Sequence, residues 1–455
     1  MAGLCAARVL AERFEQVLVV DRDNLPEEAE WRGQVPQGRH QHVLLPAGAR
    51  ILDGWFPGLL AEVEEAGGVP IDLSGDFAWH RAGGPWRRPP SSLRSVSMSR
   101  PLVETAVRHR VEDLPGVTVR GDEPVTGLEF DSAWSRITGV VLADRSVDAG
   151  LVVDATGRRC QTLNWLEDLG YEPPPVTRVE VGIRYVTQVY ERSEVPARDW
   201  EAAFVVGDPT TRRMAAAVPF EDDRWFVLLS GVNGEEPPTD RDEALEWVRS
   251  LDSPMIAEVM EASRPVGEPV THRFPTEQRR HFDRLRHYPL GWVPIGDAVC
   301  SFNPLYGQGM TVAAQQAEAL GVELDRRDDV DRMFARRYFR ALRRITEDPW
   351  QIAVGGDFAY GGTSGPKPRG TDQMGRYLAR LAVAAQHDDL IALRLKEVAS
   401  LERSPRSLLS PRALVRGLRA ARRGPLNDSS RTSGLRSQRG QPDGNQGGEK
   451  EPVGH

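Results

Sequence analysis

The sequence predicts an α/β fold in which a three-layer domain carries an inserted antiparallel sheet and is followed by a helical C-terminal region. Three observations support this fold class. Short apolar strands that run into an aspartate recur at Gln16–Asp21, Ala149–Asp154 and Gly291–Asp297, far apart in the chain. Residues 176–285 instead alternate apolar and polar positions, which is typical of antiparallel strands. After Leu320 the apolar positions recur mainly at helical spacing.

Composition narrows the class of protein. The chain has 455 residues, enough for two or three domains, and its net charge of −8 with 27% charged residues gives no sign of nucleic-acid binding. No apolar run is long enough to span a bilayer, and the N-terminus lacks the features of a signal peptide. Three cysteines, Cys5, Cys160 and Cys300, have no metal-ligand or redox spacing. We therefore expect a cytoplasmic protein without a metal site or disulfide framework.

The N-terminal residues read as the second half of a Rossmann βαβ unit. A helical pattern at Leu4–Phe14 leads into an apolar strand at Gln16–Val20, which ends at Asp21. If Gly3 is the last glycine of a G-x-G-x-x-G turn, Asp21 follows it by 18 residues (21 − 3), as the fingerprint requires. The first strand and the leading glycines would then precede Met1. We expect that the sequence is truncated, or that its start is assigned too late.

The next segments predict a mixture of loop, helix and hairpin. A basic loop at 32–42 offers Arg39 and His42 as candidate phosphate or ring contacts, with a solvated loop as the alternative, and a helix is expected at 43–52. Residues 76–97 are rich in Trp, Arg, Pro and Gly and suit a hairpin beside a substrate. Ser99 and Pro101 open a helix that should run to Glu112.

A second strand-end motif follows. Strands are expected at 116–120, at 125–131 paired with 137–143, and at 149–154. The last of these runs into Asp154-Ala155-Thr156-Gly157-Arg158. A carboxylate and a glycine directly after a buried strand are suited to a ligand that lies against the strand end.

The third motif is the most specific. A short strand at Gly291–Ile295 ends at Gly296-Asp297, and a loop stiffened by Pro304 leads to Gly307-Gln308-Gly309 at the start of a helix. An aspartate at a strand end can accept hydrogen bonds from a ribose hydroxyl. Glycines allow the backbone to approach a flat ring closely. A helix N-terminus aimed at that ring favours negative charge on it.

These three motifs, in this order, resemble the group A flavin-dependent monooxygenases, the para-hydroxybenzoate hydroxylase-like and squalene epoxidase-like FAD-binding oxidoreductases. The resemblance spans about residues 1–400 and implies a Rossmann-like FAD-binding domain. It implies that Asp297 binds the FAD ribose, that the Pro304–Met310 segment lies against the isoalloxazine, and that Arg100 reaches the cofactor. The full set of FAD-binding positions that we predict is Gly3, Asp21, Arg22, Arg39, Arg100, Val125, Asp154, Gly157, Gly296, Asp297, Pro304, Gly307, Gly309 and Met310.

The resemblance also implies how the chain is divided. The antiparallel strands expected at 179–190, 202–206, 214–219 and 224–230 would roof the flavin, followed by helices at 241–251 and 256–262 and a strand at 266–274. The expected domains are FAD-binding segments at 1–75, 99–175 and 286–325, a substrate-side insertion at 76–98, a substrate-binding β-sheet domain at 176–285, a helical region at 326–423 and a disordered tail at 424–455.

Four aromatic residues of the sheet are ambiguous. Tyr185, Phe204, Trp225 and Phe226 can line a substrate cavity, but aromatic residues at alternating positions are more often plain core.

The C-terminal third is predicted to be helical. A helix at 330–346 should break at Asp348-Pro349-Trp350, before a glycine-rich loop at 355–362, and helices follow at 372–385 and 389–401. Residues 408–423 form a basic amphipathic segment, with Leu414 and Leu418 apart from the arginines. A solvated packing helix is the favoured interpretation and an anionic membrane surface the alternative.

The function implied by the resemblance is NAD(P)H-dependent monooxygenation. In that family NAD(P)H reduces FAD transiently, O2 forms a flavin C4a-hydroperoxide, and one oxygen atom passes to an apolar or aromatic small molecule by hydroxylation or epoxidation. No catalytic acid or base can be named from the sequence. A flavin halogenase is nearly excluded, because no lysine precedes Lys367 and no Trp-x-Trp-x-Ile-Pro motif occurs. A geranylgeranyl-reductase-like enzyme and a degenerate FAD-binding protein remain as alternatives.

Overall fold

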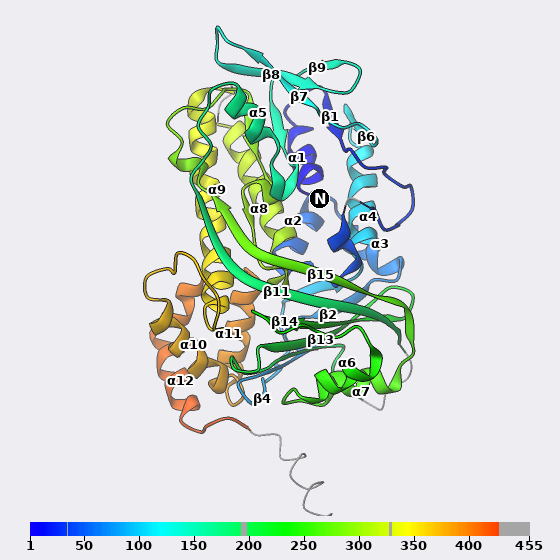
Figure 1. The fold of residues 1–455 in the computed structure, drawn as a ribbon, viewed down its shortest axis with the longest axis vertical. Coiled ribbons are helices and arrows are strands. Elements are labelled where there is room, and N and C mark those ends of the chain that lie inside the picture. The colour runs from blue at the N-terminus through cyan, green and yellow to red at the C-terminus, as the bar shows by residue number, and fades with distance from the viewer. Residues whose placement is uncertain (34, 193–197, 327–329, 427–455) are drawn as a thin grey trace, which may run out of the picture.

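The computed structural model describes residues 1–33, 35–192, 198–326 and 330–426 and confirms the mixed α/β fold class (Figure 1). Parallel strands and their helices form one end of the molecule. A large mixed sheet forms the other end, and C-terminal helices lie along one side. Among the described residues, no helix is long and apolar enough to cross a bilayer.

The parallel strands fall into two separate pairs. β1 (Val17–Val20) pairs with β6 (Val117–Arg120), and β10 (Val152–Asp154) pairs with β16 (Trp292–Pro294). Residues of β1 and β10 line the same cavity, which therefore reaches between the two pairs.

Helices cover these strands. Apolar residues of α1 (Ala2–Leu10) and α8 (Gly309–Leu324) are buried in one core together with residues of β16 and α4. The predicted helix start at Ser99 is confirmed, because the Ser99 hydroxyl accepts a hydrogen bond from the Leu102 amide. The other helices and strands of this half are α2 (Pro46–Trp55), α3 (Leu59–Glu65), β2 (Val69–Asp72), β5 (Arg94–Ser97), α4 (Arg100–Glu112), β7 (Gly127–Asp131), β8 (Arg136–Val141), β9 (Ser146–Asp148) and α5 (Thr162–Asp168).

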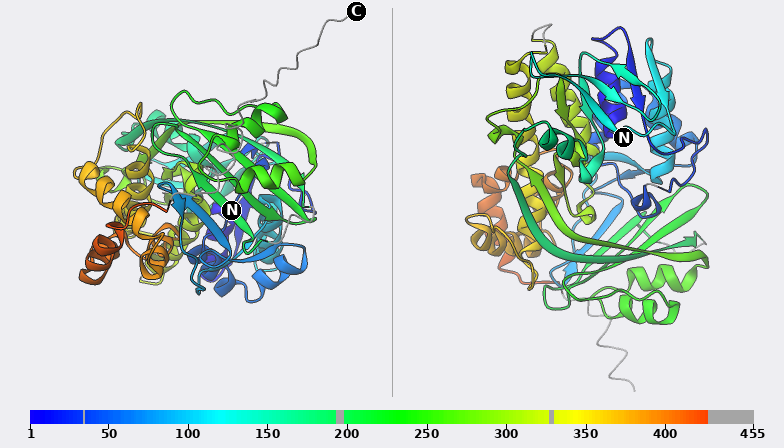
Figure 2. Two further views of the ribbon diagram at one scale, coloured as in Figure 1. Left: turned by 90° about the horizontal axis from the view of Figure 1, so that it is seen from below. Right: turned by 45° about the horizontal axis from the view of Figure 1, so that its top comes forward.

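The large sheet has eight strands in the order β17-β15-β11-β14-β13-β12-β3-β4. All neighbours are antiparallel except β12 and β3, which are parallel. The strands are β3 (Phe77–Arg81), β4 (Gly84–Pro85), β11 (Val176–Glu191), β12 (Ala202–Val206), β13 (Arg213–Phe220), β14 (Arg224–Gly231), β15 (Pro265–Arg280) and β17 (Cys300–Ser301). β11 and β15 form a long curved ribbon that runs from the sheet toward the parallel strands (Figure 2).

The two faces of this sheet have different roles. Helices α6 (Arg241–Arg249) and α7 (Met255–Ala262) cover the outer face, where Trp225 is fully buried. On the inner face Tyr185 and Phe204 line the cavity. Phe226 does not line it, because its ring stacks on Phe220 at 3.9 Å between centroids. The cavity interpretation therefore holds for two of the four predicted aromatic residues and the core interpretation for the other two.

The predicted break at Pro349 is wrong. Helix α9 (Arg332–Asp357) continues through the proline and takes in the start of the predicted glycine-rich loop. Apolar side chains are buried on both sides of Pro349, from Tyr338 and Leu342 to Val354. Burial of this continuous face outweighs the hydrogen bond that the proline removes, a loss of about 3 kcal/mol.

The last helices form a separate small core. Helices α10 (Thr371–Ala384), α11 (Asp389–Ala399) and α12 (Pro411–Ala421) bury apolar residues against one another and against Trp86. Of the predicted disordered tail, residues 427–455 lie outside the described residues.

Candidate functional site

A cavity of about 2470 Å³ lies between the parallel-strand half and the large sheet. It is larger than an ordinary small-ligand pocket, which has about 300–1,000 Å³. Of the FAD-binding positions predicted from sequence, Arg39 does not line the cavity and is exposed at the end of a 3₁₀ turn, η1 (Pro36–Arg39). The positions that do line it are Gly3, Asp21, Arg22, Arg100, Val125, Asp154, Gly157, Gly296, Asp297, Pro304, Gly307, Gly309 and Met310.

The Gly296-Asp297 motif sits in a short turn, η4 (Gly296–Ala298), directly after β16. Gly296 has a φ of 68°, and a Cβ added there would lie 2.7 Å from the Ala2 Cβ. Its amide donates to the Gln316 Oε1 of α8 at 2.6 Å. Only glycine fits this approach of α1 to the turn, and the turn presents the Asp297 side chain to the cavity.

Three arginines surround Asp297. The cavity walls desolvate its carboxylate and raise its pKa, whereas Arg100, Arg158 and Arg280 oppose that shift. Arg280 is fixed by hydrogen bonds to the Ala298 and Arg158 carbonyls, both at 2.8 Å. The guanidinium of Arg158 donates to Ser301 Oγ at 3.0 Å and lies over the Phe274 ring. The Asp297 carboxyl is therefore held at the strand end, exposed to the cavity, with three guanidiniums nearby.

The loop from Asn303 to Gly309 leaves open backbone at the cavity. Gly307 has a φ of 65°, and a Cβ added at Gly309 would meet no atom within 4 Å. The Gln308 side chain between them is 1% exposed, and neither its amide oxygen nor its amide nitrogen has a hydrogen-bond partner. A buried amide without partners costs about 1–3 kcal/mol per group. The N-terminus of α8, its bare glycine and this amide suit a flat ring with hydrogen-bonding edges, so the residues fit an isoalloxazine.

Two buried acids hold this loop from behind. Asp357, at the end of α9, accepts hydrogen bonds from Asn303 Nδ2 at 3.0 Å and from the Tyr306 hydroxyl at 3.1 Å. Glu277 of β15 accepts one from the Asn303 amide at 3.0 Å. Burial and the charge of nearby Asp357 raise the pKa of Glu277 to about 9. Burial also raises the pKa of Asp357, to about 7, so with Glu277 protonated the pair carries at most one negative charge.

The Asp154 motif is a turn rather than a free carboxylate. Asp154 is 3% exposed and accepts hydrogen bonds from the Thr156 amide at 2.9 Å, the Thr156 hydroxyl at 2.6 Å and Cys160 Sγ at 3.2 Å. These bonds shape the turn that carries Gly157, where φ is 78° and the space beyond the backbone is open. Asp154 thus positions the backbone of this wall of the cavity.

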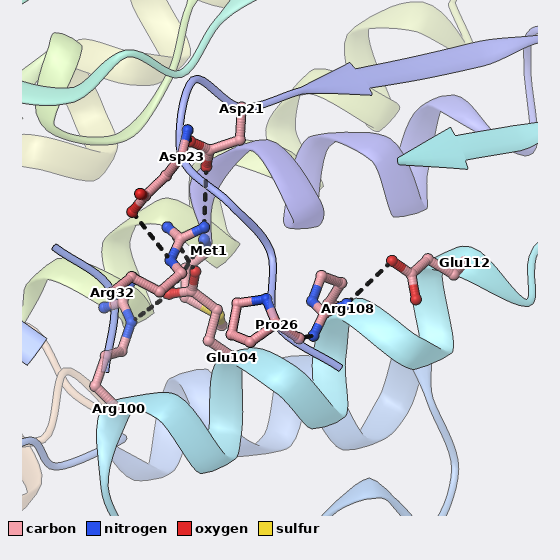
Figure 3. Close-up of polar contacts among 9 residues, drawn as sticks. All are labelled: Met1, Asp21, Asp23, Pro26, Arg32, Arg100, Glu104, Arg108 and Glu112. Carbon is pink, nitrogen blue, oxygen red and sulfur yellow. Dashed lines mark hydrogen bonds and ion pairs between the residues drawn. The ribbon is translucent and has the colours of Figure 1, made fainter. Parts of the chain in front are cut away.

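A charged cluster lies where β1 ends, and Figure 3 shows it. Arg32 pairs with Asp21 at 3.2 Å and with Glu104 at 3.1 Å, and Arg100 pairs with the other oxygen of Glu104 at 2.8 Å. Burial opposes ionisation of Glu104, but the neighbouring positive charges, Arg100 and Arg32 among them, outweigh it and lower its pKa. Two guanidiniums are thereby fixed at the cavity wall, where they suit the phosphates of a diphosphate ligand.

The other end of the cavity is aromatic. His40 donates to or accepts from the Thr187 hydroxyl at 2.9 Å and packs edge-on against Tyr185, beside His272. Burial lowers the pKa of His40 to about 3, so this imidazole is neutral at physiological pH. Trp79 and Trp86 stack at 5.4 Å and 11°. A planar apolar ligand fits beside these rings.

A buried lysine closes this end. Lys396 of α11 is 2% exposed and donates to the Ser74 carbonyl at 2.9 Å and the Arg87 carbonyl at 3.2 Å. Burial lowers its pKa to about 7. Within the described part of the chain, no group of three or more His, Cys, Asp or Glu residues is placed to hold a metal ion.

Sequence reasoning missed several of these residues. Arg32 lies in the loop for which Arg39 and His42 were predicted. His42 and Arg32 line the cavity and Arg39 does not, and spacing alone does not tell which basic residue points inward. Glu104, Glu277 and Asp357 look like ordinary polar positions of helices or strands, and only the tertiary fold brings them to the cavity or beneath its loop. The amide of Gln308 had a signal, since it stands inside the Gly-x-Gly motif itself.

Comparisons with known proteins agree with this geometry. The chain is 32% identical to Protein Rv3254 of Mycobacterium tuberculosis (strain ATCC 25618 / H37Rv) over 440 residues, 92% of each chain. It is 28% identical to kynurenine 3-monooxygenase of Salinispora arenicola (strain CNS-205) over 344 residues, 70% of this chain and 69% of that protein. No model of a known protein family matches the chain.

A solved structure shows the same fold. The p-nitrophenol 4-monooxygenase PnpA from Pseudomonas putida DLL-E4 superimposes with a TM-score of 0.58 at 17% identity, covering 88% of this chain and 96% of that one.

Proposed function

This protein belongs to the group A flavin-dependent monooxygenases, and from that premise we propose that it uses NAD(P)H and O2 to hydroxylate or epoxidise an apolar or aromatic small molecule. One observation carries the proposal. All of the predicted FAD positions except Arg39, together with a wall of aromatic side chains, line one cavity. A ring held by Gly307–Gly309 and a planar substrate beside Tyr185 and Trp79 would share that space.

Each part of the site has a role in this proposal. Bound FAD supplies the redox and oxygen chemistry. The Asp297 carboxylate would accept a hydrogen bond from a ribose hydroxyl, and Arg32 and Arg100 would hold the phosphates. The amide of Gln308 would bond an edge of the ring, and the N-terminus of α8 would stabilise negative charge near it.

The substrate side has to exclude water and orient the reacting carbon. The inner face of the sheet, with Tyr185 and Phe204, covers the cavity from one side. The imidazole of His40 is held by the Thr187 hydroxyl and is neutral, so it adds no charge to this side of the cavity. An apolar or aromatic substrate is the class that such a wall binds best.

The first experiment tests cofactor binding. We expect purified protein reconstituted with FAD to retain flavin absorbance, and Asp297→Ala to lose it more readily, with a Kd for FAD raised about tenfold or more, since a charge-assisted hydrogen bond contributes about 1.5–3 kcal/mol. Asp252→Asn, on an exposed side chain after α6, is the matched control and should leave the Kd unchanged. Equal FAD affinity in Asp297→Ala and wild type would refute the assignment of Asp297.

The second experiment separates the reactions. NADPH or NADH oxidation is followed with and without O2, together with H2O2 release and transfer of ¹⁸O from O2 to a panel of aromatic and polyene substrates. Label in the product supports monooxygenation. Product formed without O2 would instead indicate a reductase, and failure to hold any flavin would indicate a degenerate FAD-binding protein.

A further inference from the structure

Helix α12 presents an unusual surface at the outer edge of the molecule. In Figures 1 and 2 it lies at the corner formed by the C-terminal helices, beside α10 and away from the large sheet. Four large apolar side chains in and around it are exposed: Leu409 at 44%, Val415 at 68%, Leu418 at 44% and Leu426 at 45%. Apolar side chains exposed this close together are uncommon on a surface that meets only water.

Packing fixes which face of α12 points outward. The buried positions are the small residues Ala413, Gly417 and Ala420. A Cβ added at Gly417 would lie 2.4 Å from the Leu381 side chain, so α12 lies directly against α10. The helix cannot rotate to bury Val415 and Leu418 without bringing arginines into this contact. Their exposure is therefore a fixed property of the fold.

The same surface is strongly basic. Arg412, Arg416, Arg419, Arg422 and Arg423 lie on or just after α12, and no acidic residue occurs between Glu402 and Asp428. Only Arg416 makes an ion pair with a described residue, to Asp388 at 2.8 Å. This positive segment belongs to a chain of net charge −8. The positive charge of α12 is therefore opposite in sign to the net charge of the protein.

From this combination we propose that α12 docks on an anionic phospholipid surface, lying flat with Val415 and Leu418 among the acyl chains and the arginines at the headgroups. The chemistry is that of an interfacial helix, in which apolar side chains enter the boundary and flanking cations pair with lipid phosphates. A nucleic acid would use the arginines but not the apolar residues between them. The proposal does not depend on the reaction that the cavity performs.

Docking would place the aromatic end of the cavity near lipid. Leu378 of α10, Leu395 of α11 and Leu408, three residues before α12, line the cavity wall. An apolar substrate dissolved in a bilayer would then reach this wall without crossing bulk water. The structure confirms the predicted packing helix, whose buried face is Ala413, Gly417 and Ala420, and the proposal assigns a partner to its exposed face.

The test is co-sedimentation with phosphatidylcholine vesicles that do or do not contain phosphatidylglycerol. Wild type should bind the anionic vesicles and should dissociate as salt is raised, because screening shortens the reach of the charges. Arg412→Glu with Arg419→Glu should lower the partition coefficient at least about thirtyfold, because each of the two lost arginines contributes about fivefold and the added carboxylates are repelled as well. Val415→Ser with Leu418→Ser should lower it about tenfold.

A matched control carries the same charge change elsewhere. Arg336→Glu with Arg340→Glu alters exposed arginines of α9 and should leave vesicle binding within about twofold of wild type. Unchanged thermal melting of all variants shows that they fold. Equal binding to neutral and anionic vesicles, or an equal loss in the α9 control, would overturn the proposal. So would single-stranded RNA that binds as tightly and is unaffected by the two serine substitutions.

Discussion

Replacing Glu277 by Gln should make the protein less sensitive to alkaline pH. Glu277 is fully buried in β15, where one oxygen accepts a hydrogen bond from the Asn303 amide at 3.0 Å and the other has no partner. Desolvation, followed by the charge of Asp357, raises its pKa from 4.5 to about 9. Gln has nearly the same shape, keeps the acceptor for Asn303 and carries no charge at any pH.

The sign of the effect follows from proton binding. Between pH 4.5 and about pH 9 the folded protein holds a proton on Glu277 that the unfolded chain releases. The contribution of Glu277 to the free energy of unfolding is therefore fully present below pH 4.5 and is lost as pH rises through about 9. One group contributes a slope of at most about 1.4 kcal/mol per pH unit, or about 3 kcal/mol between pH 6 and pH 8.

Thermal unfolding measures this difference. At about 2.1 cal/mol/K per residue, a chain of 455 residues has an unfolding entropy near 1 kcal/mol/K, so about 3 kcal/mol corresponds to about 3 °C. Between pH 6 and pH 8 the Tm of wild type should fall about 3 °C more than that of Glu277→Gln. Glu268→Gln, on an exposed position of the same strand, should keep the wild-type slope. A parallel pH dependence in wild type and Glu277→Gln would refute the reasoning, because Glu277 would then be ionised in the folded protein.

Three further changes test other contacts. Burial lowers the pKa of Lys396 from 10.5 to about 7, so its contribution to the free energy of unfolding increases as pH rises from about 7 to 10.5. From pH 7 to pH 9 the Tm of Lys396→Met should therefore drop by up to about 3 °C relative to that of wild type. A Tm difference between the two proteins that does not change with pH would contradict this. Asp240→Ala removes the side-chain cap of α6, which accepts from the Asp242 and Glu243 amides, and should cost about 1 kcal/mol in calorimetry, whereas an unchanged Tm would show the cap to be unimportant. Gly48→Ala would place a Cβ 2.4 Å from Thr311 Oγ1 and should cost about 1–3 kcal/mol, and full wild-type stability would show that α2 and α8 can separate freely.

The sequence predicted the strand-end motifs well because their signals are local. A buried strand, an aspartate and a glycine stand together at Asp154 and Asp297, and both lie at the cavity as expected. The fold class follows from the same strands and from the alternation in the sheet. Tyr185 and Trp225 show the limit, since each stands between an arginine and an apolar residue, and only the fold decides which face each meets.

Other features depend on contacts between distant segments. The predicted strand at 266–274 continues to Arg280 because residues 276–280 pair with β11. The polar sequence Pro275–Arg280 alone does not predict this extension. Pro349 breaks the local pattern of a helix, yet apolar contacts on both sides keep α9 continuous. The Arg32–Glu104 pair joins a loop to a helix more than seventy positions away.

The curved ribbon of β11 and β15 has a mechanical consequence. One end pairs with β17 and reaches Glu277, which holds the Asn303 loop, and the middle carries Tyr185 and His272 over the cavity. A ligand that lifts the roof at Tyr185 would therefore strain the same two strands that support the loop. Occupancy of the aromatic end should therefore speed hydrogen exchange at the Asn303 amide, because strain in the ribbon weakens the hydrogen bond from this amide to Glu277.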